Sequence, residues 1–126
     1  MVTVERSVAA PADRVWRVLV DLDAWPLWGP SVRGAELDGG GRELGRGSRG
    51  SVDTALGFSL PFVVTEFDAG RYWAWEVGGV PATGHEVIGD VVGCRVRFGV
   101  PWWAVGYLPV CAVALGRVEA VATGLR

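Results

Sequence analysis

Residues 98–124 read FGVPWWAVGYLPVCAVALGRVEAVATG, and this stretch decides the fold. No charged residue occurs from Phe98 through Gly116, and charge returns only at Arg117 and Glu119. The apolar residues of the stretch fall on more than one face of a helix, whereas a helix on a protein surface has a single apolar stripe. We therefore expect a C-terminal helix that the rest of the chain surrounds.

A transmembrane helix is the alternative interpretation of this stretch, because its uncharged run approaches the roughly 20 residues that cross a bilayer. Four residues that disfavour a regular helix interrupt the run, namely Gly99, Pro101, Gly106 and Pro109. A proline inside a helix removes a backbone hydrogen bond, but at the first helical position it is well tolerated. We expect a buried helix that starts near Pro101, and no membrane span.

The bulk composition is typical of one globular domain, which we expect to cover residues 1–126. The chain is 50% hydrophobic and 21% charged, and its 126 residues suffice for one core but not for two. The net charge of −2, from 12 basic and 14 acidic residues, gives no reason to expect a nucleic-acid partner.

The two cysteines, Cys94 and Cys111, and the single histidine, His85, do not have the spacing of a metal site. We therefore expect neither a metal ion nor another cofactor. The first twenty residues carry charges that would interrupt the apolar segment of a signal peptide. This favours a cytoplasmic protein with free thiols, although the spacing alone leaves a Cys94–Cys111 disulfide open.

The remaining residues form a pattern of short strands joined by short loops. The strand from Cys94 to Val100 is the clearest example, because Cys94, Val96 and Phe98 share a face opposite Arg95 and Arg97. Short connections between successive strands imply an antiparallel meander. Strands are predicted over 2–8, 31–37, 47–56, 58–67, 71–77, 84–91 and 94–100, a turn over 78–83, a helix after Pro11 and a short helix within 21–29.

The segment from Ser7 to Pro30, SVAAPADRVWRVLVDLDAWPLWGP, resembles the opening of a known group of proteins. In that opening a strand runs through Ala-Pro into a Val-Trp helix and on to an Asp…Trp-Pro…Trp segment. Looser similarities occur at Arg71–Trp75, His85, Gly93–Val96 and Leu115–Glu119. On these residues the chain resembles the helix-grip superfamily, also called SRPBCC or Bet v 1-like, which includes START domains and the polyketide cyclase/dehydrase group.

The resemblance implies an α+β fold in which a seven-stranded antiparallel sheet curls around a long C-terminal helix. It also implies two short helices between strands 1 and 2, and a cavity between the sheet and the long helix. The superfamily uses this cavity for lipids, sterols, polyketides and other apolar ligands. The resemblance implies no single activity, because the same fold serves binders, transporters and cyclases.

The C-terminal helix departs from the pattern of the superfamily, in which its outward face should be polar. Here the stretch is apolar through Leu115. Exposed apolar patches usually mark a contact with a partner or a membrane surface. The sequence therefore suggests a homodimer, or docking on a membrane surface, through Trp102, Trp103, Val110 and Val113.

His85 is the only group expected to titrate near neutrality. With an ordinary hairpin register it points the same way as Trp73 and Trp75, into the cavity. It is our candidate catalytic acid–base, with Tyr107 as a second polar group. The alternative interpretation is a histidine on the surface beside Gly84.

Large side chains supply the candidate walls of the cavity. Trp16, Trp25 and Trp28 are expected to pack the short helices against the sheet, and both cysteines are interpreted as inert packing. The alternative is that aromatic side chains fill the cavity completely. The candidate ligand-binding residues are Phe58, Phe62, Trp73, Trp75, His85, Phe98, Tyr107 and Cys111.

Three functional hypotheses follow from these observations. The first is a binder of a small hydrophobic or aromatic ligand in the cavity. The second is an enzyme similar to polyketide cyclases or dehydratases, with His85 as acid–base and Tyr107 as donor. The third is a module for dimerisation or another interaction that has no open cavity.

Overall fold

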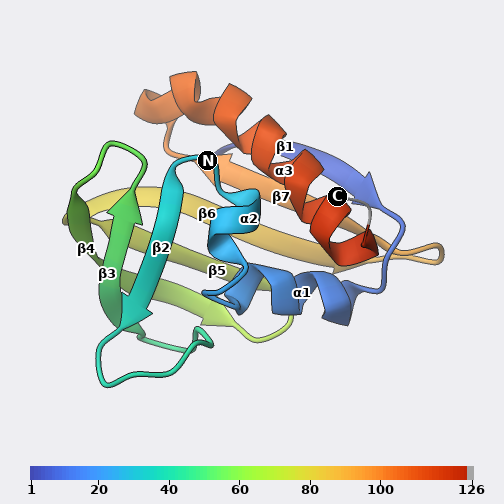
Figure 1. Ribbon diagram of the computed structural model, residues 1–126. Helices are drawn as coiled ribbons and strands as arrows, with labels where there is room; N and C mark the ends of the chain where they lie inside the picture. Colours follow the sequence, from blue (N-terminus) through green and yellow to red (C-terminus); the bar gives the residue numbers. More distant parts are fainter. Residues whose placement is uncertain (125–126) are drawn as a thin grey trace.

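The computed structural model describes residues 1–124, and its central element is a seven-stranded antiparallel sheet (Figure 1). The strand order across the sheet is β1-β7-β6-β5-β4-β3-β2, so each strand from β2 to β7 pairs with its neighbour in sequence and β1 returns to pair with β7. The strands are β1 (Val2–Val8), β2 (Val32–Leu37), β3 (Arg49–Thr54), β4 (Ser59–Asp68), β5 (Tyr72–Val77), β6 (Val80–Gly89) and β7 (Cys94–Val100).

The helices lie on one face of this sheet (Figure 1). They are α1 (Ala12–Val20), α2 (Trp25–Trp28), the 3-10 helix η1 (Trp102–Tyr107) and α3 (Leu108–Thr123). Helix α3 contacts β1, β7 and both short helices, while α1 contacts β6 and α2 contacts β2. The expected α+β helix-grip fold, including the two short helices between the first two strands, is confirmed.

Two tryptophans hold the short helices together. The last carbonyl groups of a helix have no partner within the helix. At the end of α1, the indole Nε1–H of Trp25 donates to the carbonyl oxygen of Leu19 at 2.9 Å, and that of Trp28 donates to the carbonyl oxygen of Val18 at 3.1 Å. The Trp-Pro-Leu-Trp segment therefore satisfies the end of α1 and buries both indole rings beneath α3 and the sheet.

The hairpin between β5 and β6 differs from the prediction. Its turn consists of Gly78 and Gly79 alone, with φ of 61° and 80°, and Val77 pairs with Val80. Two central residues with positive φ make the tight turn that matches the twist of paired strands, and glycine adopts this conformation without a steric penalty. The predicted turn over 78–83 was therefore wrong, because β6 begins four residues earlier than the expected residue 84.

The C-terminal helix begins near Pro101, as expected, but its first six residues form the 3-10 helix η1. The α-helix starts at Leu108, and Pro109 lies in its first turn, where a missing N–H is tolerated. The helical segment from Trp102 to Thr123 is long and apolar enough to cross a membrane, a property that core helices of soluble proteins share. In the structure α3 buries Cys111, Ala114, Leu115, Val118 and Ala122.

The predicted division of β7 into two faces is confirmed. The side chains of Cys94, Val96 and Phe98 are buried beneath the helices. On the opposite face Arg97 forms an ion pair with Glu86 on β6 at 3.2 Å, and Arg95 forms one with Glu5 on β1 at 3.2 Å. These partly exposed pairs contribute little to stability, but they show which face of the sheet meets solvent.

Candidate functional site

A cavity lies between the sheet and the C-terminal helical segment, and it consists of two adjoining chambers. The inner chamber holds about 50 Å³ and the outer chamber about 270 Å³. Ligand pockets generally hold about 300–1,000 Å³, so only the outer chamber approaches the size that a ligand needs. The neck, defined as the residues that line both chambers, consists of Ser31, Val32, Trp75, Thr83 and Tyr107.

The outer chamber is bounded by the ends of two hairpins and by η1. Thr54 stands at the end of β3, Pro81 and Ala82 follow the β5–β6 turn, and Trp103 and Ala104 belong to η1. Its walls are almost entirely hydrocarbon, and the hydroxyl-bearing side chains among its lining residues are Ser31, Thr54, Thr83 and Tyr107.

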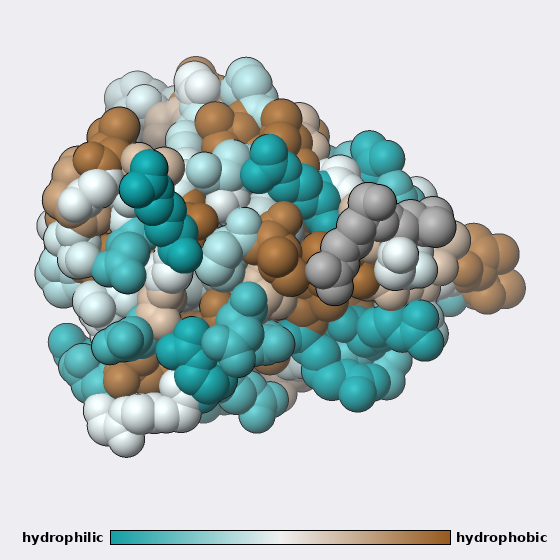
Figure 2. Space-filling view, in the orientation of Figure 1, coloured by the Kyte–Doolittle hydropathy of each residue, from teal (hydrophilic) through white to brown (hydrophobic). Residues whose placement is uncertain are grey.

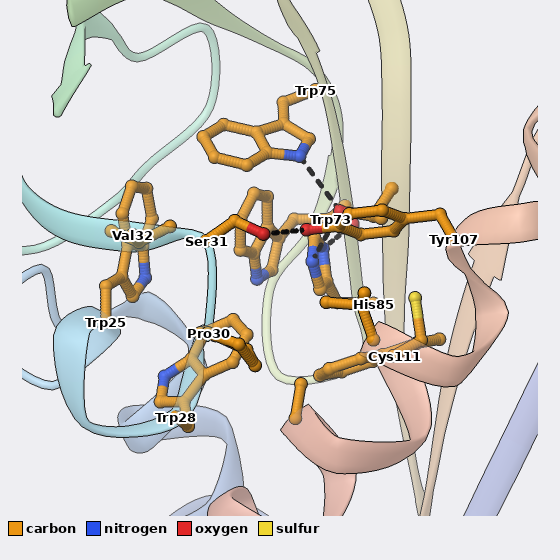
Figure 3. A pocket seen from close by; sticks show the side chains of 15 residues that line it. Trp25, Trp28, Pro30, Ser31, Val32, Trp73, Trp75, His85, Tyr107 and Cys111 are labelled. Carbon is orange, nitrogen blue, oxygen red and sulfur yellow. Dashed lines mark hydrogen bonds between the residues drawn. The ribbon is translucent and has the colours of Figure 1, made fainter. Parts of the chain in front are cut away.

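Aromatic rings fill most of the inner end. The imidazole of His85 stacks on the indole of Trp73, with ring centroids 3.9 Å apart and 22° between the planes. Trp73 stacks in turn on Trp25, with centroids 5.6 Å apart and 10° between the planes. Phe98 and Trp28 also pack against the imidazole in T-shaped arrangements, with ring centroids 4.8 Å and 6.0 Å away. This packing explains why the inner chamber is so small (Figure 3).

A directional chain of hydrogen bonds runs through the inner end. The Nδ1 atom of His85 lies 3.2 Å from the carbonyl oxygen of Trp73, which can only accept, so Nδ1 carries the proton. The Nε2 atom must then accept from the hydroxyl of Thr83, 2.9 Å away. That same hydroxyl oxygen accepts from the indole N–H of Trp75 at 3.0 Å. Both nitrogens of the imidazole are therefore occupied within the protein.

Burial keeps the imidazole neutral. Desolvation lowers the pKa of His85 from its ordinary value of 6.5 to about 3, against the smaller opposing effect of the bond to the Trp73 carbonyl. The ring would have to take up a proton among apolar side chains, which disfavours the charged form. At neutral pH the imidazole of His85 is thus neutral, and both of its ring nitrogens are hydrogen-bonded within the protein. It lines the cavity and has no proton at Nε2 to donate.

The hydroxyls of Ser31 and Tyr107 form the second polar feature of the neck, with their oxygens 2.7 Å apart (Figure 3). Burial raises the pKa of Tyr107, and the bond to Ser31 lowers it by less, so the phenol is neutral at physiological pH. Two hydroxyls carry two hydrogens, and their mutual bond uses one. The pair therefore retains one O–H that can donate to a ligand.

Most of the predicted site residues lie together. Of the eight candidates, Trp73, Trp75, His85, Phe98, Tyr107 and Cys111 line the inner chamber. Phe62 is buried behind them against Trp25 and Trp75, and it lines neither chamber. Phe58 is half-exposed just beyond the β3–β4 turn and also lies outside both chambers.

Two polar residues of the neck were missed. Thr83 stands two positions before His85 on β6, so a period of two would have put it on the same face. It was assigned to the turn instead. Ser31 could not have been found from spacing, because it is 76 residues from its partner Tyr107.

The cysteines offer no evident chemistry. Cys94 and Cys111 are both buried and free, which answers the question of a disulfide left open by the sequence. Burial raises the pKa of both thiols and so reduces the fraction of reactive thiolate. Within residues 1–124, no group of three or more His, Cys, Asp or Glu side chains is arranged to hold a metal ion.

The family of the chain follows from its sequence as a whole. Residues 1–123 match the model of the family described as polyketide cyclase / dehydrase and lipid transport. The chain belongs to this family. Membership confirms the resemblance to the helix-grip superfamily that rested on Ser7–Pro30. No curated protein shows significant similarity to this family member in sequence.

Solved structures support the fold of this family member. Protein MLL2253 from Mesorhizobium loti superposes with a TM-score of 0.77 at 13% identity, covering 99% of this chain and 98% of that one. Protein NE0264 from Nitrosomonas europaea gives 0.72 at 17% identity, with coverage of 98% and 94%. Protein Ms6760 from Mycobacterium smegmatis gives 0.68 at 18% identity, with coverage of 98% and 91%. At these identities the likeness concerns the fold alone.

Proposed function

We propose that this family member binds a small apolar ligand that carries one oxygen acceptor. The apolar body of the ligand occupies the outer chamber, and its oxygen accepts the free O–H of the Ser31–Tyr107 pair at the neck. The observation that carries the proposal is an apolar chamber of about 270 Å³ whose inner end presents this available donor. Apolar walls with a few placed polar groups are the usual composition of a ligand site.

The size of the outer chamber limits the affinity. Removing about 200 Å² of apolar ligand surface from water contributes about 5 kcal/mol at ~25 cal/mol per Å². The neck hydrogen bond contributes about 1 kcal/mol more. Because association also costs translational and rotational freedom, this sum of about 6 kcal/mol is an upper limit, and we expect dissociation constants between about 0.05 mM and a few mM for ligands of this size.

The enzymatic alternative, with His85 as acid–base and Tyr107 as donor, has less support. A general base needs a free lone pair aimed at the substrate, but the Nε2 lone pair of His85 already accepts from Thr83. A general acid needs a proton near neutral pH, and the pKa of about 3 leaves none at Nε2. We therefore assign His85 a structural role in shaping the neck.

Calorimetry with a matched pair of probes tests the proposal. 1-Indanone and indane have the same bicyclic carbon skeleton, and only indanone carries a carbonyl oxygen. We expect indanone to bind about five- to tenfold more tightly, which is the effect of one hydrogen bond. The variant Ala82→Trp places an indole in the outer chamber and should abolish binding of both probes.

The matched control is Ala112→Trp, because Ala112 lies on the exposed face of α3 and lines neither chamber. This variant should bind both probes as the wild type does. The proposal is wrong if neither probe binds at millimolar concentration, or if both tryptophan variants bind equally well.

A further inference from the structure

Three segments that meet at the end of the molecule around the outer chamber carry no charge. Successive turns of an antiparallel sheet alternate between its two ends, so the β3–β4 turn, the β5–β6 turn and the start of η1 meet at one end. The corresponding segments, residues 54–65, 77–84 and 98–116, contain no Asp, Glu, Lys, Arg or His. The nearest charges are Asp53 and Glu76, which directly precede two of these segments, and Arg33 near the start of β2.

The opposite end of the sheet has a different composition. The loop between β2 and β3 carries Asp38, Arg42, Glu43 and Arg46, and the β6–β7 turn carries Asp90. Charged loops thus lie at one end of the strands, whereas the three segments around the outer chamber carry no charge.

Large apolar side chains project from all three uncharged segments. Trp102 is 77% exposed and Leu56 is 82% exposed, and both lie outside the chambers. Figure 2 shows hydrophobic side chains gathered on the left of the view, over the β3–β4 turn. A separate hydrophobic tip appears at the far right, over the β6–β7 turn. We define the apolar rim as Leu56, Phe58, Val80, Trp102, Trp103 and Val105.

The position of the outer chamber decides what covers the apolar rim. Trp103 belongs to the rim and also lines the chamber, so the chamber opens within the rim. A second copy of the chain on the rim would seal this opening and prevent a ligand from entering. A fluid lipid surface would leave the opening in contact with apolar molecules, and exposed tryptophans are enriched where proteins meet the membrane interface. The absence of charge on the three segments suits the headgroups of a zwitterionic lipid.

We propose that the apolar rim docks on the surface of a lipid bilayer, so that the outer chamber opens toward the membrane. The choice of a lipid surface over a second copy of the chain rests on the proposed ligand-binding function. The existence of the apolar rim does not depend on that function. The docking is interfacial and shallow, because the rim consists of side chains on three turns. The long axis of α3 need not cross the bilayer for this contact.

Vesicle flotation with the full chain tests the docking. The probe is vesicles of phosphatidylcholine alone, compared with vesicles that also contain phosphatidylglycerol. We expect the wild type to float with both kinds equally, and about 0.5 M salt should not release it, because screening weakens only electrostatic contacts. The double variant Leu56→Glu with Trp102→Glu should reduce partitioning at least about tenfold, since each buried apolar side chain contributes more than 1 kcal/mol.

The matched control is Val91→Glu with Val92→Glu, at the exposed hydrophobic tip of the β6–β7 turn. This variant should float like the wild type. Because all four residues are exposed, both double variants should keep the wild-type melting temperature. The double variant Leu56→Ser with Trp102→Ser provides a second test of the contact between the rim and the vesicle. Equal loss in the rim and control variants would overturn the proposal.

Two further results would also overturn the docking. One is a wild type that fails to float with either vesicle. The other is a wild type that sediments as a dimer and becomes monomeric in the rim variant, which would assign the rim to a second copy. Indanone calorimetry without vesicles separates the two proposals, because the rim variant retains both chambers. If the wild type floats with vesicles but does not bind indanone, only the ligand-binding proposal is refuted. If it binds indanone but does not float, only the docking proposal is refuted.

Discussion

The inner and outer chambers of the cavity are neighbours, yet they are built in opposite ways. At the inner end, rings of Trp25, Trp73 and His85 stack on one another and the polar atoms of His85 are bonded within the protein. In the outer chamber the walls are apolar and partly exposed, and Trp103 faces solvent. Close packing stabilises the fold, whereas unfilled apolar space is what a ligand requires.

The difference indicates a division of labour along the cavity. The inner end contributes stability and a fixed shape, and the outer chamber contributes binding. The neck connects the two, because Thr83 belongs to the bonded chain while the Ser31–Tyr107 pair keeps a free donor. Substitutions at the inner end should therefore affect mainly the free energy of unfolding, and substitutions at the neck or outer chamber should affect mainly affinity.

The largest effect is expected from a matched pair of tryptophan truncations. Trp73→Ala should lower the free energy of unfolding by about 3–5 kcal/mol, because Trp73 is fully buried and leaves a cavity. Trp103→Ala should lower it by less than about 1 kcal/mol, since Trp103 is half-exposed. Urea unfolding of both variants measures the difference, and equal losses would contradict the proposed division.

The second effect concerns pH. The pKa of His85 is about 3 in the folded chain and 6.5 when the residue is exposed, so the unfolded state binds more protons between these values. Stability should be complete above pH 6.5 and fall as the pH decreases toward 3. The expected loss is about 2 kcal/mol between about pH 7.5 and pH 5, from a slope of about 1.4 kcal/mol per pH unit.

Urea unfolding of wild type and His85→Gln across this range isolates the contribution of the histidine, and only the wild type should show this dependence. Proton NMR gives an independent measurement, because the chain has one histidine. Its imidazole signals should not titrate above pH 5 in the folded protein. A midpoint near 6.5 would mean that the inner end is open to water.

The smallest effect is expected at the neck. Tyr107→Phe removes the hydroxyl that bonds to Ser31. It should change the free energy of unfolding by about 1 kcal/mol or less, because the lost bond is partly exposed. In calorimetry the preference for indanone over indane should shrink to about twofold or less, since Ser31 alone is less well oriented. An unchanged preference would assign the ligand oxygen to another group.

Much of the fold could be predicted because its patterns are local. The alternation of Cys94, Val96 and Phe98 with Arg95 and Arg97 assigned the two faces of β7 correctly. The predicted direction of His85 was also correct, since Trp73 and His85 are paired across β5 and β6. A period of two is enough to place side chains on faces once strands pair.

The remaining features depend on tertiary structure. Val110 was one of four candidates for an outward contact of the last helix, but it is half-buried and lines the inner chamber, because the phase of α3 is set by packing. Trp102, Trp103 and Val113 are exposed, as expected of that face. Phe58 was predicted to line the cavity because its side chain is large and aromatic. It instead follows the β3–β4 turn, whose position only the paired strands define. Four expectations stay predictions, namely a homodimer, the lack of a nucleic-acid partner, the lack of a cofactor and a cytoplasmic location.

The two-glycine turn between β5 and β6 determines which side chains the cavity contains. Side chains of a strand alternate between its faces, so a shift of one residue in the pairing of β6 with β5 would invert β6. Gly84 and Glu86 would then point toward Trp25 and Trp73, and the imidazole would move to the solvent side of the sheet. A carboxylate among indoles cannot be accommodated without neutralisation. The two-glycine turn, which fixes the pairing of Val77 with Val80, thus favours the register in which His85 and not Glu86 faces the interior.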